Sequence, residues 1–135
     1  MNVQSGIDLV KNDRILKAVE KQGRPFLDRI WTGDEQADCH IGTGRPTMGC
    51  AASLAARFAA KEAVAKALGT GIGPQGVRWT DIEIRRLPGG QPRVCLTGGA
   101  AARYQSMGGM SISVSMSHEA GLSIAHCVIL YREPL

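Results

Sequence analysis

RFAAKEAVAKALGTGIG, residues 57–73, is the stretch that decides how this chain folds. Its alanine content predicts a long helix from about Ala51 to Leu68. Gly69 is the predicted stop signal, because glycine readily adopts the left-handed conformation that ends helices. Four charged residues interrupt the helix, and three glycines follow it at alternate positions. A helix that only packs needs neither the four charges nor all three glycines, so both features call for an explanation.

The charged residues of this helix fall at different angles around its axis. At about 100° per residue, several apolar residues share one face. That face contains Leu54, Phe58, Ala65 and Leu68, with Lys61 among them, Glu62 at the edge and Lys66 one turn beyond Glu62. Lys61 on such a face either extends its ammonium to solvent or meets an anion. Glu62 and Lys66 have the spacing of an i, i+4 ion pair, which is common on solvated helices.

The glycines after the helix do not form a phosphate loop of the Walker type. Such a loop places its glycines before the lysine and the helix, so that helix N–H groups face the phosphate. Here the glycines follow the helix, at the negative end of its dipole. A phosphate bound near this helix would therefore need positive charge from Arg57, Lys61, Lys66 and a divalent metal.

The composition describes one domain with a net positive charge. The chain has 135 residues, 44% hydrophobic and 21% charged, as in ordinary globular domains. A formal charge of +4 favours polyanionic partners, whether nucleic acid, nucleotide phosphates or acidic proteins.

The sequence shows no signal peptide and no apolar run long enough for a bilayer, so we expect a cytoplasmic protein without a membrane partner. The four cysteines form no C-x-x-C pair, which favours free thiols over a zinc site.

Periodicity and turn residues divide the chain into mixed strands and helices. In order, we predict a strand over 3–10, helices over 14–23 and 26–31, a loop over 33–50 with room for one helical turn, the helix over 51–68, strands over 79–87 and 92–98 joined at 88–91, a helix over 100–108, and two strands within 110–131 joined at 118–121. Asn12 or Asp13 is expected to cap the first helix, and Pro25 opens the second. The absence of regular βαβ alternation predicts the α+β class.

Asp8 is an acidic residue inside an apolar strand. Strand periodicity places Ile7 and Leu9 on one face, and Gly6, Asp8 and Val10 on the other. An isolated carboxylate in such a place is costly without a cation or several hydrogen-bond donors. Asp8 could bind a metal ion or accept hydrogen bonds from backbone N–H groups, and the spacing alone favours the second.

Four basic residues form a candidate docking surface. Arg14, Lys17, Lys21 and Arg24 fall within about 80° of arc if the first helix is extended to Arg24. Such a stripe is either a solvated face or a surface that docks an acidic partner. His118 closes the strand SISVSMSH on its apolar side and, taken alone, is more typical of a packed histidine than of a catalyst.

Together these segments resemble the holo-acyl-carrier-protein synthase family, the small 4′-phosphopantetheinyl transferases. The matching segments are GIDLV, DRI, FLDRIWTGDE, RFAAKEAVAKALGTGIG, WTDIEI, GGQPRVCLTG and SMSHE, which span almost the whole chain in order. The resemblance implies a single domain over residues 1–135, in which an antiparallel sheet packs against a long central helix. It also implies a homotrimer with active sites between subunits.

The reaction that the resemblance implies moves the phosphopantetheine arm of coenzyme A onto a serine of an apo acyl carrier protein. Adenosine 3′,5′-bisphosphate is the other product. Asp8 and Glu62 would bind Mg²⁺, which also accepts the pyrophosphate oxygens. Glu62 would activate the serine, Lys66 would stabilise the departing bisphosphate, and His118 is the third residue assigned to catalysis.

The resemblance assigns further residues to the two substrates. Those assigned to coenzyme A are Asp8, Arg57, Lys61, Lys66, Gly69, Thr70, Gly71, Ser117 and His118. Arg57 and Lys61 would hold its phosphates, His118 a phosphate or the pantetheine end, and the glycine turn would let backbone approach closely. Those assigned to docking the acidic carrier protein are Arg14, Lys17, Lys21 and Arg24.

Two other functions compete with this interpretation. A nucleic-acid-binding domain would use the basic helix and show a steep salt dependence, but it leaves Asp8, Glu62 and the glycine turn without a role. A non-catalytic scaffold would bind a carrier protein tightly without modifying it.

Overall fold

Helices and antiparallel strands share this chain without a βαβ repeat. The computed structural model describes residues 1–42 and 46–133. Its elements are β1 (Asn2–Lys11), α1 (Asn12–Gln22), α2 (Arg24–Ile30), α3 (Gly33–Asp38), α4 (Met48–Leu68), the 3-10 turn η1 (Trp79–Asp81), β2 (Ile82–Arg86), β3 (Pro92–Leu96), α5 (Gly98–Ser106), β4 (Gly109–Glu119) and β5 (Leu122–Tyr131). Strand β5 pairs antiparallel with β1 and β4, and β2 pairs antiparallel with β3. The predicted α+β class is confirmed.

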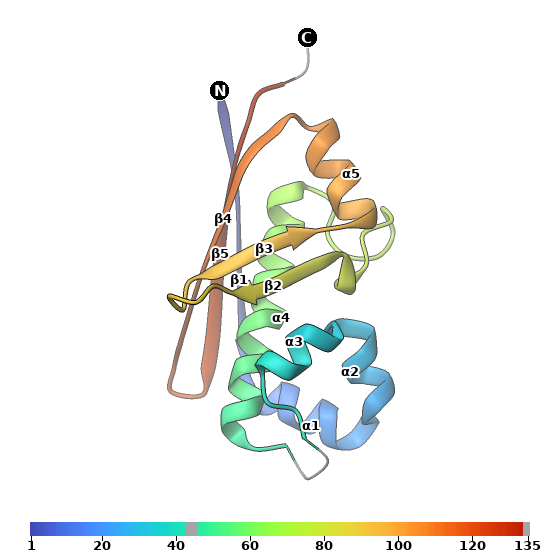
Figure 1. Cartoon of the computed structure of the whole chain (residues 1–135), viewed down its shortest axis with the longest axis vertical. Helices are drawn as coiled ribbons and strands as arrows, with labels where there is room; N and C mark the ends of the chain where they lie inside the picture. The colour runs from blue at the N-terminus through green and yellow to red at the C-terminus, as the bar shows by residue number, and fades with distance from the viewer. Residues whose placement is uncertain (43–45, 134–135) are drawn as a thin grey trace.

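The long helix α4 packs along one face of the three-stranded sheet, whose order is β1-β5-β4. Figure 1 shows α4 beside this sheet, with α1, α2 and α3 gathered near one end of α4 and α5 near the other. The register pairs Ala125 of β5 with both Asp8 and Met116. Directly paired residues point to the same face of a sheet. Asp8 on β1 and Met116 on β4 therefore lie at opposite edges of the face that α4 covers.

Gly6 lets β1 and α4 approach each other closely. A Cβ atom at this position would lie 2.0 Å from the carbonyl oxygen of Ala63 and 2.9 Å from the amide nitrogen of Ala67. Because no bulky side chain separates the strand from the helix, residues on the adjoining flank of α4 are brought beside the side chains of β1.

Helix α4 is buried on nearly all sides. The apolar face predicted from the sequence is only part of its contact surface, since Ala59, Ala60 and Ala63 are as completely buried as Leu54 and Leu68. The sheet covers one side of the helix, and α1 and β2 contact other parts of it. An alanine-rich sequence suits this position, because small side chains allow close approach from every direction.

The ends of α4 follow local capping rules. The helix begins at Met48, three residues earlier than predicted, because Thr47 caps it: the Thr47 hydroxyl accepts a 3.0 Å hydrogen bond from the amide of Cys50. It ends at Leu68 as predicted, and Gly69 follows with a φ of 80°.

The prediction of a loop over 33–50 is partly wrong, because Gly33–Asp38 form helix α3. This helix starts with a capping box, in which the Thr32 hydroxyl accepts from the Glu35 amide (3.1 Å) and Glu35 Oε1 accepts from the Thr32 amide (2.9 Å). The T-x-x-E signature of such a box is visible in TGDE and could have predicted the helix. Residues 43–45 of the predicted loop lie outside the described residues.

The predicted cap of the first helix is also wrong. Lys11 occupies the cap position of α1, without a side-chain hydrogen bond. The Asn12 side chain is buried instead, and its Oδ1 accepts a 2.6 Å hydrogen bond from the Ser123 hydroxyl. Gly23 separates α1 from α2 with a φ of 65°, so α1 cannot be extended to Arg24, which is the first residue of α2.

The later elements differ from the predictions mainly in their bounds. The segment predicted as a strand from Trp79 begins with η1 and becomes β2 only at Ile82, whereas β3 ends at Leu96. All four cysteines are free, as expected. Among the helices of the described residues, none combines the length and apolar character needed to cross a membrane.

The sheet face turned away from α4 carries exposed apolar side chains. Val3, Ile7 and Leu9 of β1 are 59%, 55% and 58% exposed, and Ile124 of β5 is 37% exposed. Register places these side chains on one face, next to alternating serines of β4. A contiguous apolar patch of this kind on a small protein is typical of an interaction surface.

We expect Gly6→Ala to lower the free energy of unfolding by about 1–3 kcal/mol, because the new Cβ overlaps backbone atoms that cannot rotate away. Equilibrium unfolding in urea measures this change. Gly33→Ala is the matched control, since nothing lies within 4 Å of its Cβ position. Equal stability of Gly6→Ala and the wild type would contradict the close packing of β1 on α4.

Candidate active site

Asp8, Glu62 and Lys66 lie on the flank of α4 beside β1, and we call this region the acidic flank. Asp8 belongs to β1, and the other two residues belong to successive turns of α4. Lys66 Nζ donates a 2.9 Å hydrogen bond to the carbonyl oxygen of Ile7 and lies 3.4 Å from Asp8 Oδ1. Lys66 therefore pairs with Asp8, and not with Glu62 as the i, i+4 spacing suggested.

The half-buried carboxyl group of Glu62 is unfavourably placed for carrying a negative charge. Burial raises its pKa above the ordinary value, and the negative charge of Asp8 raises this pKa further. The positive charges of Lys66 and Arg14 lower the pKa of Glu62 but do not cancel these effects. The carboxylates of Asp8 and Glu62, which were predicted to converge, are thus close enough to repel each other.

The chemistry of this donor set fits a divalent cation. A cation between Asp8 and Glu62 would relieve their repulsion, and Mg²⁺ commonly binds one or two carboxylates together with water and phosphate oxygens. Within residues 1–42 and 46–133, no group of three or more His, Cys, Asp or Glu side chains could hold a metal. The remaining ligands of such an ion would have to come from water or from a phosphate-containing substrate.

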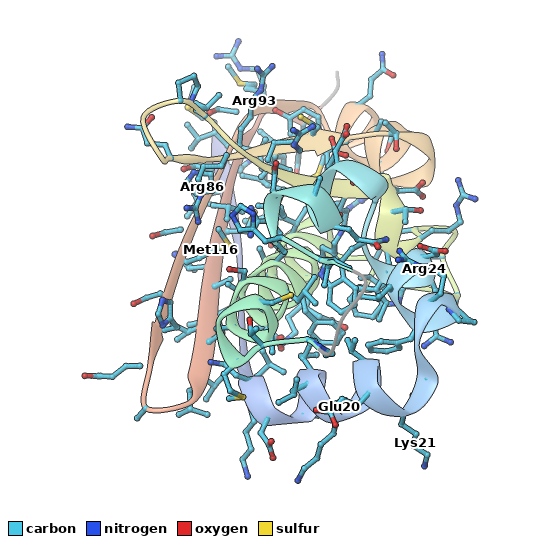
Figure 2. All side chains as sticks on the ribbon, turned by 60° about the horizontal axis from the view of Figure 1, so that its bottom comes forward. Glu20, Lys21, Arg24, Arg86, Arg93 and Met116 are labelled. Atoms are coloured by element: carbon cyan, nitrogen blue, oxygen red, sulfur yellow. The ribbon has the colours of Figure 1, made fainter. Side chains whose placement is uncertain are left out.

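A second set of predicted residues lies on the other flank of α4, beside β4. Arg57, Ser117 and His118 line one cavity of about 520 Å³ together with Arg86 of β2, and we call it the arginine cavity. Arg57 and Glu62 are separated by about 140° around the helix axis. The structure therefore divides the predicted site residues into two groups. Figure 2 shows Arg86 along one edge of the molecule, beside Met116, which lines the same cavity.

Arg57 is a buried cation without a carboxylate partner among the described residues. It is 2% exposed. Its hydrogen bonds are long, at 3.3 Å from Nε to the carbonyl oxygen of Ile84 and 3.4 Å from Nη1 to that of Ser53. A buried charge without a counter-ion is costly, so this cavity favours an anionic ligand. His118 is exposed at the cavity, which excludes the packed-histidine alternative.

Sequence reasoning missed Arg86, although a signal was present. Successive strand residues point to opposite faces. Arg85 lies 3.0 Å from a carboxylate oxygen of Asp34 and 3.0 Å from one of Asp38, on one side of β2. Arg86 consequently faces the arginine cavity, and the alternation within IEIRR could have identified it.

The prediction that Lys61 holds a coenzyme A phosphate is wrong. Its side chain is completely buried. The ammonium donates to Glu35 Oε1 (2.7 Å) and to the carbonyl oxygens of Trp79 (3.0 Å) and Ile82 (2.5 Å). An ammonium has three hydrogen-bond donors, and all three are used within the protein. The anion that Lys61 meets is the carboxylate of Glu35.

The glycine turn lies at the C-terminus of α4. Gly69 and Gly71 have φ angles of 80° and 61°, and the Thr70 hydroxyl donates a 2.8 Å hydrogen bond to the carbonyl oxygen of Gly71. Arg103 Nε donates a 2.8 Å hydrogen bond to the carbonyl oxygen of Leu68. This guanidinium offsets the negative end of the helix dipole, and so reduces the repulsion that a phosphate would meet there.

The predicted basic stripe is interrupted. Arg14, Lys17 and Lys21 are exposed on α1, but Arg24 belongs to α2, where its Nη1 donates a 2.6 Å hydrogen bond to Gln36 Oε1. Figure 2 shows Lys21 and Arg24 well separated. The candidate docking surface therefore consists of three residues on α1, with Arg24 apart from them.

Comparisons with known proteins identify the family of this chain. The chain matches the model of the 4′-phosphopantetheinyl transferase superfamily over residues 4–121. It is 46% identical over 133 residues to a holo-acyl-carrier-protein synthase of Rhodopseudomonas palustris (strain BisB5), covering 96% of this chain and 94% of the relative. It is 42% identical over 129 residues to a holo-acyl-carrier-protein synthase of Ruminiclostridium cellulolyticum, covering 96% and 92%.

Solved structures share the fold. The holo-acyl-carrier-protein synthase of Helicobacter pylori, in complex with coenzyme A, matches with a TM-score of 0.79 at 33% identity, over 93% of this chain and 99% of that one. The synthase of Neisseria meningitidis matches with a TM-score of 0.80 at 32% identity, over 94% and 97%. The chain therefore belongs to the 4′-phosphopantetheinyl transferase superfamily, among its holo-acyl-carrier-protein synthases.

Proposed function

We propose that this enzyme uses Mg²⁺ to transfer 4′-phosphopantetheine from coenzyme A to a serine of an apo acyl carrier protein. Adenosine 3′,5′-bisphosphate is released. The observation that carries the proposal is the meeting of Asp8 and Glu62, from β1 and α4, with Lys66 beside them. Two carboxylates and a lysine in this arrangement suit the transfer of a phosphate-linked group.

The chemistry exchanges one P–O bond for another. The serine oxygen of the carrier forms a bond to the phosphorus that bears the pantetheine, and the bond from this phosphorus to the bridging oxygen of the pyrophosphate breaks. Glu62 accepts the serine proton, directly or through one water, and its raised pKa suits a general base. Lys66 stabilises the charge that develops on the bisphosphate. When bound, Mg²⁺ offsets the charge of the diphosphate.

We assign the phosphate groups of coenzyme A to the arginine cavity. Arg57 supplies a buried positive charge there, and Arg86, Ser117 and His118 line the same space. Gly69, Thr70 and Gly71 offer backbone to the cofactor without intervening bulk, because two of the three are glycines.

The separation of the two groups supports an active site between copies of the chain. One chain presents its acidic flank and its arginine cavity on different flanks of α4, which favours a site in which a neighbouring copy brings the second group to the ligand. We propose a homotrimer in which the acidic flank of each copy faces the arginine cavity of the next. The exposed Val3, Ile7, Leu9 and Ile124 on the outer sheet face would be buried by this assembly.

The exposed basic residues of α1 are the proposed docking surface for the carrier protein. Arg14 connects this surface with the acidic flank, because its charge acts on the carboxyl group of Glu62. Lys21 extends the positive charge along α1. Lys17 is paired with Asp13 (2.9 Å), and Arg24 lies apart on α2. An acidic carrier would be steered towards this side of the molecule.

We also propose a cytoplasmic location, where coenzyme A and carrier proteins are used.

We expect the enzyme to add one phosphopantetheine to each apo carrier molecule in the presence of Mg²⁺, and a chelator to abolish this transfer. Asp8→Asn and Glu62→Gln should each slow it by at least about a hundredfold, because they remove a metal ligand or the base. Intact-mass spectrometry of the carrier measures the product. Asp34→Asn, which alters an acid on α3, is the control. A folded Asp8→Asn or Glu62→Gln variant with full activity would contradict the assignment.

Without divalent metal, we expect Glu62→Gln to melt at a higher temperature than the wild type at neutral pH. The pKa of Glu62 is raised by folding, so its contribution to stability is complete below the unfolded-state pKa and is lost as the pH rises through the folded-state pKa. Glutamine does not ionise, so the difference should vanish at acidic pH. Mg²⁺ should raise the melting temperature of the wild type but not of the variant. The same Mg²⁺ response in both proteins would rule out a metal ligand at Glu62.

Mixed trimers should recover activity that neither parent has. We expect Asp8→Asn and His118→Ala to be inactive alone, but equal amounts unfolded and refolded together should give about a quarter of wild-type activity, because one site in four combines two intact halves. Either parent refolded alone is the control. Failure of the mixture to gain activity, with subunit exchange verified by mass, would place the whole site within one chain.

A further inference from the structure

Glu35 and Lys61 form a fully buried ion pair that joins four parts of the chain. Both side chains are completely shielded from solvent, with 2.7 Å between Lys61 Nζ and Glu35 Oε1. Glu35 also accepts hydrogen bonds from the amide of Thr32 (2.9 Å) and, through Oε2, from the amide of Ile84 (2.9 Å). A buried ion pair is often no more stabilising than well-packed apolar residues. The Glu35–Lys61 pair therefore matters mainly for the positions of the segments that it joins.

The ammonium of Lys61 holds η1 from both ends. It binds the carbonyl oxygen of Trp79, the first residue of η1, and that of Ile82, the residue directly after it. The chain before η1 is rich in glycine, and Gly71, Gly73 and Gly76 all have positive φ angles. Glycine restrains the backbone weakly, so the position of η1 depends on other contacts. Lys61 Nζ binds carbonyl oxygens at both of its ends, and Asp81 Oδ2 accepts a 3.0 Å hydrogen bond from the Arg78 amide.

Fixing η1 also fixes the indole ring of Trp79. This ring stacks on Phe58 with 4.7 Å between ring centroids and 27° between ring planes. Phe58 lies one turn before Glu62 on α4, on the side towards the acidic flank. The buried hydrogen bond from Lys61 Nζ to the carbonyl oxygen of Trp79 thus helps to place the Trp79–Phe58 stack next to Glu62, the proposed base.

The Trp79–Phe58 stack forms one wall of a cavity of about 280 Å³ whose lining includes Arg14, and we call it the Arg14 cavity. Arg14 belongs to the proposed docking surface and also acts electrostatically on Glu62. A carrier that contacts Arg14 and places its serine at Glu62 would pass across this cavity. The position of its Trp79 wall would then limit how closely the carrier can approach.

We propose that Glu35 and Lys61 are positioning residues for carrier binding, which act through Trp79 and set the wall of the Arg14 cavity. This inference rests on the function proposed above. It assigns the pair no contact with coenzyme A or with the reacting atoms. Loss of the pair should therefore weaken the use of the carrier protein and leave the use of coenzyme A unchanged.

The test is the double variant Lys61→Met with Glu35→Gln, which removes both charges and keeps similar side-chain volumes. We expect a cooperatively folded protein whose KM for apo carrier rises about tenfold, with kcat and the KM for coenzyme A within about twofold of wild type. Calorimetry without coenzyme A should show a matching loss of affinity for apo carrier. If the double variant does not fold, Lys61→Met alone, in which the Glu35 carboxylate keeps its two backbone amide donors, is measured in the same way.

Ile129→Ala is the matched control, because it removes buried volume on β5, away from η1, and should lower stability without changing either KM. A folded variant of the pair with a wild-type KM for the carrier would overturn the inference. So would equal rises in both KM values, which would indicate a general structural role. A wild-type enzyme without transfer activity would instead refute the proposed function, and the calorimetric comparison would still test the positioning role.

Discussion

The arrangement of α4 depends on the buried ammonium of Lys61. This charge has no access to water, and its three acceptors come from α3, η1 and the start of β2. Removing any one of them would leave a buried charge incompletely compensated, which costs several kcal/mol. The segments around α4 must therefore be in place together. Because Gly6 fits against the opposite side of the same helix, α4 is held in one rotation about its axis, and this rotation directs Glu62 towards β1.

The four charges of the central helix have four different environments, which explains why an alanine-rich helix contains them. Lys61 is neutralised inside the protein, and Arg57 is buried at a cavity without a carboxylate partner. Lys66 pairs with Asp8, and Glu62 is held where its negative charge is disfavoured. The helical period of 3.6 residues separates these positions by angle. One continuous element can therefore provide a structural anchor, an anion site and an acidic site.

The elements could be predicted from the sequence because their signals are local. Strand alternation placed Asp8 on the same face of β1 as Gly6 and Val10, and Gly69 marked the end of α4. The errors concern contacts between distant residues. Lys61 and Glu35 are 26 positions apart, so helix periodicity could show that Lys61 needed a partner but could not identify it. Asn12 failed as a cap because its side chain binds Ser123, 111 positions away. Two features were missed despite a local signal, namely helix α3 and the place of Arg86 at the arginine cavity.

Placing carboxylates and arginines on different flanks of α4 has an electrostatic advantage. If Arg57 lay beside Glu62, the two would form an ion pair, and neither would be available to a metal ion or a phosphate. Separation by about 140° around the axis prevents this within one chain. In the trimer that we propose, the opposite charges come together only across the subunit boundary, where the diphosphate of coenzyme A and its metal ion lie between them. Assembly would then create the site without an ion pair between Arg57 and Glu62 forming in the isolated chain.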